Sequence, residues 1–180
     1  MCDSDWSSDV CSSDLAFMRG DLDCGCAWEP AVSNMLKADG HLIVSAKSQE
    51  LWGIKVFDII GANKDFAQEY PELITKFLEV TDRSTRYLRE HPDESAALIA
   101  KVAGIEEDQC KSILKNMEYL TKKEQISSQW LGSSDTPGQL IDFAAGMSEF
   151  LKEQGEIDKS LGKDEIAQYV DQSFYEAVSQ

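Results

Sequence analysis

The sequence predicts an α/β protein with a large share of helix, and three observations support this fold class. Residues 19–30 contain a helix stop, a short apolar run and a helix start. Gly20 suits the helix stop because glycine adopts the left-handed conformation that closes a helix without steric cost. Pro30 suits the helix start because its missing N–H would be unpaired there anyway. Two more short apolar runs, 41–45 and 56–61, have the length and composition of buried strands.

The other elements follow from apolar periodicity and from residues that cap or stop a helix. We expect strands at 24–28, 41–45 and 56–61, and helices at 16–19, 31–38, 63–70, 71–89, 93–103, 106–117, 136–154 and from 164 onward. A polar connection is expected at 46–55, and a short extended piece with a turn or two of helix at 119–132. The apolar stripes of these helices, such as Leu73, Phe77 and Val80, are expected to form the core.

Composition and charge exclude several classes of function. The chain has 180 residues and a formal net charge of −16, so nucleic acid and anionic membrane surfaces are poor partners. No apolar run approaches the roughly 18 residues that span a bilayer, and no signal peptide is visible. The motifs GxGxxG, GxxxxGK[ST], GxSxG and HExxH are absent, and neither His41 nor His91 has a Ser or Cys partner nearby in sequence. We therefore expect no enzyme activity, no cofactor and no metal.

Residues 1–15 differ from everything that follows. Ser and Asp dominate them, no basic residue balances the acidic ones, and we expect them to be disordered. The string SDWSSDVCSSDL looks like a translated sequencing adapter, and a natural acidic tail is the alternative. With an adapter at the start, the natural gene would begin upstream and a missing signal peptide would carry no information.

The cysteines do not form a recognisable disulfide framework. Cys24 and Cys26 would point to the same face of one strand, a geometry unsuited to a mutual bridge. A CxC pair without a second Cys/His pair is a weak metal signal. We expect Cys24, Cys26 and Cys110 to be packing residues, with a metal or redox role as the alternative.

Asp58 is the residue with the clearest chemical significance. It lies inside an apolar predicted strand, where an ionised carboxylate is costly without a cationic partner or several hydrogen-bond donors. One interpretation is an Asp at a strand end that binds local amides. The other is a carboxylate presented to a cleft for a cationic ligand group. Trp28 and Trp52 could then form aromatic walls, which also attract ammonium groups, and Glu29 lies beside Trp28 at the same strand end.

These residues also resemble a known family. The segment AFMRGDLDCGCAWEPA at 16–31 is similar to part of the periplasmic solute-binding proteins that serve ABC transporters for taurine, alkanesulfonates and nitrate. The likeness is greatest to the taurine-binding branch. It continues through Trp52, Gly53, the strand with Asp58, 64–66, 119–121 and 150–155.

The resemblance implies a type II periplasmic binding protein fold, in which two α/β lobes close on a ligand. The chain would be a truncated C-terminal fragment of this two-lobed structure. Residues 16–45 would form the end of the second lobe, 46–55 the crossover or hinge, and 56–180 the C-terminal part of the first lobe with its helices.

A site and a function are implied as well. Asp58 would pair with the ammonium group of taurine, while Trp28, Trp52 and Gly53 would line the pocket and Glu29 would occupy a variable position beside it. The chain would be the substrate-binding component of an ABC importer for taurine or a related aliphatic sulfonate. We expect a monomer that docks on a permease and ATPase complex, in the periplasm or anchored at the extracellular membrane face. The alternatives are a protein of the same family that binds nitrate or another small organic solute, a pyrimidine-precursor synthase that uses iron, and an α-rich domain without a ligand.

Overall fold

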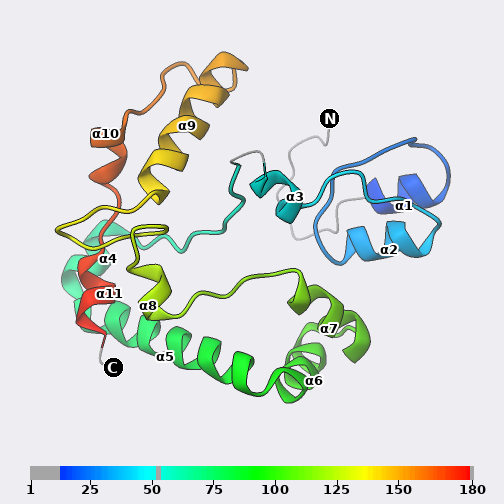
Figure 1. The fold of residues 1–180 in the computed structure, drawn as a ribbon, viewed down its shortest axis with the longest axis horizontal. Helices are drawn as coiled ribbons and strands as arrows, with labels where there is room; N and C mark the ends of the chain where they lie inside the picture. The colour runs from blue at the N-terminus through cyan, green and yellow to red at the C-terminus, as the bar shows by residue number, and fades with distance from the viewer. Residues whose placement is uncertain (1–12, 52–53, 179–180) are drawn as a thin grey trace.

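The structure is a computed structural model that describes residues 13–51 and 54–178 (Figure 1). Over these ranges it contains helices and no β-strand. The helices are α1 (Ser13–Met18), α2 (Ala31–Lys37), α3 (Ala46–Glu50), α4 (Lys64–Glu69), α5 (Pro71–Glu90), α6 (Pro92–Ala103), α7 (Glu107–Lys115), α8 (Lys122–Gln125), α9 (Leu140–Glu153), α10 (Lys163–Ala167) and α11 (Ser173–Ala177). The predicted helix-rich character is therefore present, while the described residues do not form the sheet of an α/β fold.

The three predicted strands are the largest departure from expectation. Residues 24–28, 41–45 and 56–61 pair with no described segment. The one β-bridge within the described ranges joins Gly132 and Pro137, in a turn. A strand is stable only where a neighbouring strand binds its backbone N–H and C=O groups, and no such neighbour lies beside these segments. Most of their apolar side chains stay exposed, so the strand prediction is wrong for these residues.

α5 is the longest helix and the one on which several others pack. α6 lies at one of its ends, and α4 and α11 lie toward the other (Figure 1). The buried side chains of α5 share one face of the helix and are Leu78, Asp82 and Thr85. The stripe that the sequence assigned to the core is instead exposed: Leu73, Phe77 and Val80. That assignment is wrong because the neighbouring helices pack on the other face of α5.

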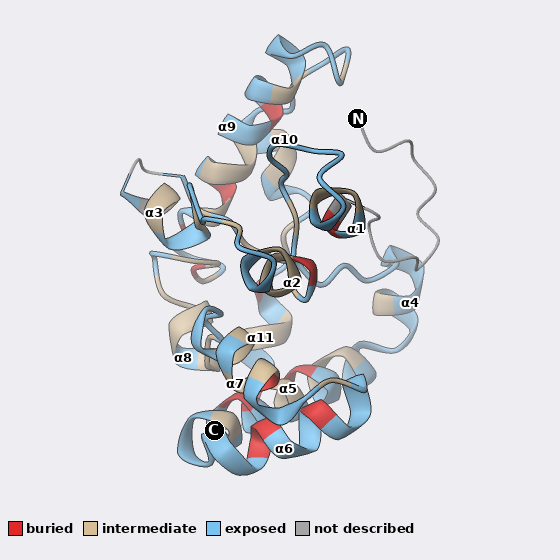
Figure 2. Ribbon diagram, turned by 90° about the vertical axis from the view of Figure 1, so that its right-hand side faces the viewer, coloured by how far each residue is buried: buried red, intermediate tan, exposed pale blue. Residues whose placement is uncertain are grey.

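The best-packed part of the molecule is the pair α6 and α7. Ala96, Ala100 and Cys110 form its fully buried centre, flanked by Ile105 and Leu114. Small side chains on α6 let the two helices approach closely. Figure 2 shows such buried residues as short patches on α5, α6 and α9, surrounded by mostly exposed surface. The packing role predicted for Cys110 is confirmed, whereas Cys24 and Cys26 are exposed free thiols in a loop.

Asp82 and Lys122 together link α5, α8 and the end of α11. Asp82 Oδ1, at 7% exposure, accepts a hydrogen bond of 2.6 Å from the backbone N–H of Lys122, the first residue of α8. Its other oxygen, Oδ2, forms an ion pair of 3.0 Å with Arg86, one turn along α5. The side chain of Lys122 then donates to the backbone carbonyl of Val178, just after α11. Three segments distant in sequence are therefore held together by polar contacts.

The N-terminal helices α1 and α2 pack against each other. Asp14 is buried between them and accepts a hydrogen bond of 3.2 Å from the side-chain amide of Asn34. α1 begins at Ser13, so helix extends into the last residues of the 1–15 stretch that was predicted to be disordered, while 1–12 lie outside the described residues. α3 occupies the first half of the predicted connection at 46–55. No helix in the described part combines the length and apolar character of a membrane span.

Candidate functional site

Asp58 lies on the extended segment 54–63, between α3 and α4. The sequence predicted a carboxylate inside a buried strand, but the side chain is exposed and the strand is not formed. Its carboxylate has no hydrogen-bond or ion-pair partner among the described residues. A solvated carboxylate of this kind carries no desolvation cost, and it is free to meet a cationic group.

Trp28 and Glu29 lie immediately before α2. Trp28 is 77% exposed, so its indole forms no closed pocket wall in this structure. The Glu29 carboxylate accepts hydrogen bonds from the backbone N–H (3.2 Å) and the hydroxyl (2.6 Å) of Ser33. Since the first N–H groups of a helix lack intrahelical partners, Glu29 stabilises the first turn of α2. That contact gives Glu29 a local structural role.

The remaining predicted site residues, Trp52 and Gly53, lie outside the described residues. Their positions relative to Asp58 are therefore not described. Trp28 and Asp58 are not brought into a common pocket by any described contact.

Tyr119 is the described residue most clearly linked to Asp58. Partial burial raises the pKa of the Tyr119 phenol, and the charges of Cys110 and Asp58 raise it further. The Asp58 charge is the smallest of these causes, and it acts on the phenol although the two residues are far apart in sequence. The family resemblance includes 119–121, but it did not identify Tyr119 as a site residue.

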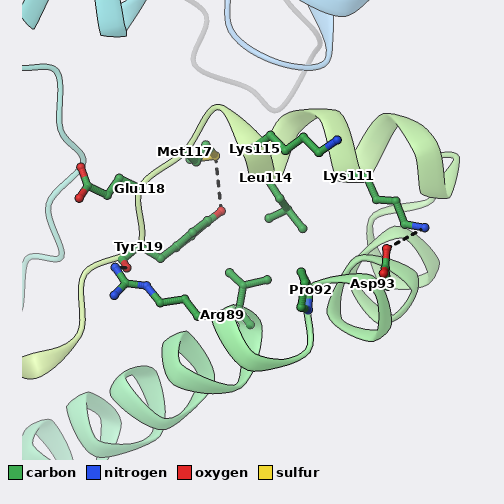
Figure 3. Close-up of a pocket in the computed structure, with 10 residues that line it drawn as sticks. Arg89, Pro92, Asp93, Lys111, Leu114, Lys115, Met117, Glu118 and Tyr119 are labelled. Atoms are coloured by element: carbon green, nitrogen blue, oxygen red, sulfur yellow. Dashed lines mark hydrogen bonds and ion pairs between the residues drawn. The ribbon is translucent and has the colours of Figure 1, made fainter.

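Tyr119 also lines a cavity among the described residues that has a volume of about 440 Å³. The cavity lies between the junction of α5 with α6 and the helix α7 with the segment that follows it (Figure 3). Its lining is Leu88, Arg89, Pro92, Asp93, Lys111, Leu114, Lys115, Met117, Glu118 and Tyr119. The Tyr119 hydroxyl points between these elements and donates to the sulfur of Met117 at 3.4 Å.

Arg89 fixes one end of this cavity. Its Nη2 donates to the backbone carbonyl of Tyr119 at 2.5 Å, and its Nη1 forms an ion pair with Glu124 Oε1 at 2.9 Å. Glu124 Oε2 in turn accepts from the backbone N–H of Thr121 at 2.8 Å and from its hydroxyl at 2.7 Å. Together these bonds lower the pKa of Glu124 from 4.5 to about 2, with the Arg89 contact as the largest cause.

The lowered pKa of Glu124 predicts an acid-dependent contribution to stability. A carboxyl with a depressed folded-state pKa stabilises the fold above its unfolded value of 4.5, and the effect is lost as pH falls through about 2. Because 39% of the Glu124 side chain is exposed, screening limits its worth to less than about 1 kcal/mol. Glu124→Gln should lower the free energy of unfolding at pH 7 and leave it unchanged near pH 2.

Urea denaturation at pH 7, 4 and 2.5 measures this difference. Glu118→Gln removes an exposed carboxylate that has no partner among the described residues, and serves as the matched control. An equal loss for both variants at pH 7, or a loss for Glu124→Gln that persists unchanged at pH 2.5, would contradict the assignment.

A second contact that the sequence did not reveal anchors the segment carrying Asp58. The ammonium group of Lys55 lies over the ring of Trp130, 3.9 Å from its centroid, and 5.7 Å from that of Phe143. Such cation–π contacts contribute roughly 0.5–1 kcal/mol at exposed sites. Lys55 thus ties the extended segment to the turn before α9. Only proximity in three dimensions reveals this pair, because 75 residues separate Lys55 from Trp130.

No group of three or more His, Cys, Asp or Glu side chains within the described ranges is placed to hold a metal ion. The Cys24 and Cys26 thiols are free and exposed, and no third ligand of these types lies beside them in the part of the chain that the structure describes.

Comparison with known proteins gives a consistent set of similarities. The family described as "NMT1/THI5 like" matches residues 7–95. A protein of Escherichia coli (strain K12) named "Taurine-binding periplasmic protein" is 28% identical over 166 residues, which cover 88% of this chain and 48% of that protein. A protein of Bacillus subtilis (strain 168) named "Putative aliphatic sulfonates-binding protein" is 28% identical over 108 residues, covering 59% of this chain and 32% of that protein.

The chain therefore spans about half the length of the first of these relatives and a third of the second. No solved structure matches the chain significantly. Both relatives are named as binding proteins and not as enzymes, which supports the prediction that this chain has no catalytic activity of its own.

Proposed function

We propose that this chain, which matches the family described as NMT1/THI5 like over residues 7–95, is part of the substrate-binding component of an ABC importer for taurine or a related aliphatic sulfonate. The observation that carries the proposal is a similarity that extends over 88% of the chain to a protein named for taurine binding. A second relative is named for aliphatic sulfonates, a class that shares the sulfonate group of taurine.

The chemistry of Asp58 fits an ammonium-bearing sulfonate. Its carboxylate is free of hydrogen bonds and cationic partners in the described part of the chain, so a ligand ammonium would meet an unoccupied anion. Nitrate carries no cationic group, and a carboxylate in the site would repel it. The free state of Asp58 therefore favours taurine over nitrate within this family.

In this proposal each predicted site residue contacts a different part of the ligand. Asp58 would bind the ammonium, Trp28 and Trp52 would supply aromatic walls, and Gly53 would line the pocket. The sulfonate would be held by backbone N–H groups and helix N-termini, which suit anions. Glu29 is a weaker candidate for ligand contact, because its carboxylate already accepts both of its described hydrogen bonds from Ser33 in α2.

Ligand binding would close two lobes around the cleft, and the closed form would dock on a permease and ATPase complex. We place the protein in the periplasm, as the name of the Escherichia coli relative states for that protein, or at the extracellular membrane face, and we expect it to act as a monomer.

Calorimetric titration with taurine tests the proposal. We expect the 180-residue chain to bind with a dissociation constant no better than about 10 mM, because an exposed ion pair to Asp58 contributes at most about 1 kcal/mol. A chimera that joins residues 16–180 to the part of the Escherichia coli relative outside the matched region should bind below about 100 µM.

A sulfonate that lacks the ammonium group of taurine provides the control ligand for the chimera. Ethanesulfonate lacks the ammonium group and should bind at least about 10-fold more weakly, since a desolvated charge pair is worth more than 1.4 kcal/mol. A folded chimera that does not bind taurine, or that binds ethanesulfonate equally well, would refute the taurine assignment.

A further inference from the structure

Cys24 and Cys26 are two free thiols outside the packed parts of the molecule. Both side chains are exposed, and only Gly25 separates them in the sequence. Cys110, the other described cysteine, is 2% exposed in the centre of α6 and α7. The described part of the chain therefore presents one accessible pair of thiols, on the loop between α1 and α2 (Figure 1).

The two ends of this loop are held by backbone hydrogen bonds. The N–H of Asp21 donates to the carbonyl of Ala16 in α1 at 2.9 Å, and the N–H of Val32 donates to the carbonyl of Trp28 at 3.1 Å. α1 and α2 also pack against each other, which fixes the two helices that carry the loop. Between these ends, residues 22–27 form no backbone hydrogen bond with a described residue. The thiols therefore lie on a stretch of backbone that is free to bend between fixed ends.

The missing strand removes an obstacle to a bond between the two thiols. In a strand, residues two positions apart have Cα atoms roughly 6.7 Å apart, whereas about 5.5–6 Å is usual for a disulfide. The described structure forms no strand at 24–28, so no neighbouring strand keeps this backbone extended. Gly25 has no side chain, and the backbone there can bend into conformations that other residues avoid. A turn at Gly25 would bring the two cysteines within bonding range.

We propose that Cys24 and Cys26 are a redox-active dithiol, which low-molecular-weight disulfides such as oxidised glutathione convert to a Cys24–Cys26 disulfide. One cysteine thiolate attacks a sulfur of the small disulfide, forms a mixed disulfide and releases one small thiol. The other cysteine then attacks the protein sulfur of the mixed disulfide and releases the second small thiol. In total the protein loses two electrons and two protons, and the small disulfide is reduced to two thiols. This site is separate from Asp58 and does not depend on the importer function.

The short separation of the two cysteines favours the closed disulfide over the mixed disulfide. Two groups joined by a short flexible stretch meet at an effective concentration in the millimolar range. With about 0.1 mM reduced glutathione, the closed form should therefore exceed the mixed disulfide about 10-fold. Cys110 cannot replace either cysteine in this step, because its thiol is buried between α6 and α7. The outcome therefore depends on the presence of both Cys24 and Cys26.

Mass spectrometry of the 180-residue chain after an acid quench measures the reaction. The chain carries Cys2→Ser and Cys11→Ser, because these two cysteines lie outside the described residues. We incubate it with an excess of oxidised glutathione over about 0.1 mM reduced glutathione. We expect a product that has lost two hydrogens and carries no glutathionyl group. The tryptic peptide 20–37, which contains both cysteines of the pair, should be lighter by the same two hydrogens. An excess of reduced glutathione should then restore both thiols.

Cys24→Ser and Cys26→Ser test the second step, because each variant retains only one thiol of the pair. Each should accumulate the mixed disulfide at least about 10-fold more than the chain with both thiols. Cys110→Ala is the matched control and should form the closed disulfide unchanged, with circular dichroism to check that it folds. A glutathionyl group that stays on the chain with both thiols, dimers linked through these cysteines, or a disulfide that excess reduced glutathione does not reopen would each overturn the proposal.

Discussion

Replacing Asp58 with Asn in the chimera should lower its taurine affinity by about 30-fold or more. Removing one partner of a desolvated charge pair typically costs 2–5 kcal/mol or more, and about 1.4 kcal/mol corresponds to a tenfold change in affinity. Asn retains the size and one acceptor of Asp, so the loss would report the charge and not a cavity. Calorimetric titration of the two chimeras with taurine measures the ratio directly.

Asp65→Asn provides a matched control for this experiment. Asp65 is also an exposed acidic residue, seven positions further along, and its substitution changes the net charge by the same amount. Its backbone N–H is bound by the Asn63 side chain at 2.9 Å, and this contact does not involve its own carboxylate. If Asp58→Asn binds taurine as tightly as Asp65→Asn, Asp58 does not contact the ligand ammonium.

The second large effect concerns stability. Asp82→Ala should lower the free energy of unfolding by about 2 kcal/mol. A hydrogen bond to a charged acceptor contributes about 1.5–3 kcal/mol, and Asp82 accepts such a bond from the first N–H of α8. The i,i+4 ion pair with Arg86 adds a few tenths of a kcal/mol. Urea denaturation of the 180-residue chain measures the change.

Asp82→Asn separates the two contributions. Asn keeps an acceptor for the Lys122 N–H and loses the charge, so its loss should be smaller than that of Asp82→Ala. Since Lys122 also reaches the carbonyl of Val178, loosening α8 should expose the C-terminal helix α11 to proteolysis in the Ala variant. An Asp82→Ala chain as stable and as protease-resistant as the parent would contradict the role assigned to Asp82.

Local signals in the sequence predicted most helices well. Pro71 and Pro92 each begin a helix, and Gly104 ends α6 with a φ of 68°, where only glycine is unstrained. α9 was expected to open at 136–137 but begins at Leu140. There the backbone groups of Ser133 and Thr136 bind each other across the turn, which delays the helix. Helices are predictable because their hydrogen bonds are formed within a few residues.

Strands and binding sites depend on residues that are distant in sequence, so both were harder to predict than the helices. The apolar runs at 41–45 and 56–61 have strand composition, yet composition does not supply the neighbour that a strand requires. For the same reason the effect of the Asp58 charge on the pKa of Tyr119 could not be read from residues 61 positions apart. The resemblance did include both segments, and the relatives' names agree with the function it implied.

We expect the extended segments that pair with no other described residues to influence how copies of this chain meet in solution. Ile43 is 84% exposed and Ile59 is 74% exposed, so the extended segments 41–45 and 56–61 present apolar side chains to neighbouring molecules. A formal charge of −16 opposes their approach over a Debye length of about 30 Å at 0.01 M salt. At 1 M salt that length shrinks to about 3 Å, and the apolar contacts then act without a repulsive barrier. We therefore expect aggregation of the chain to increase with ionic strength.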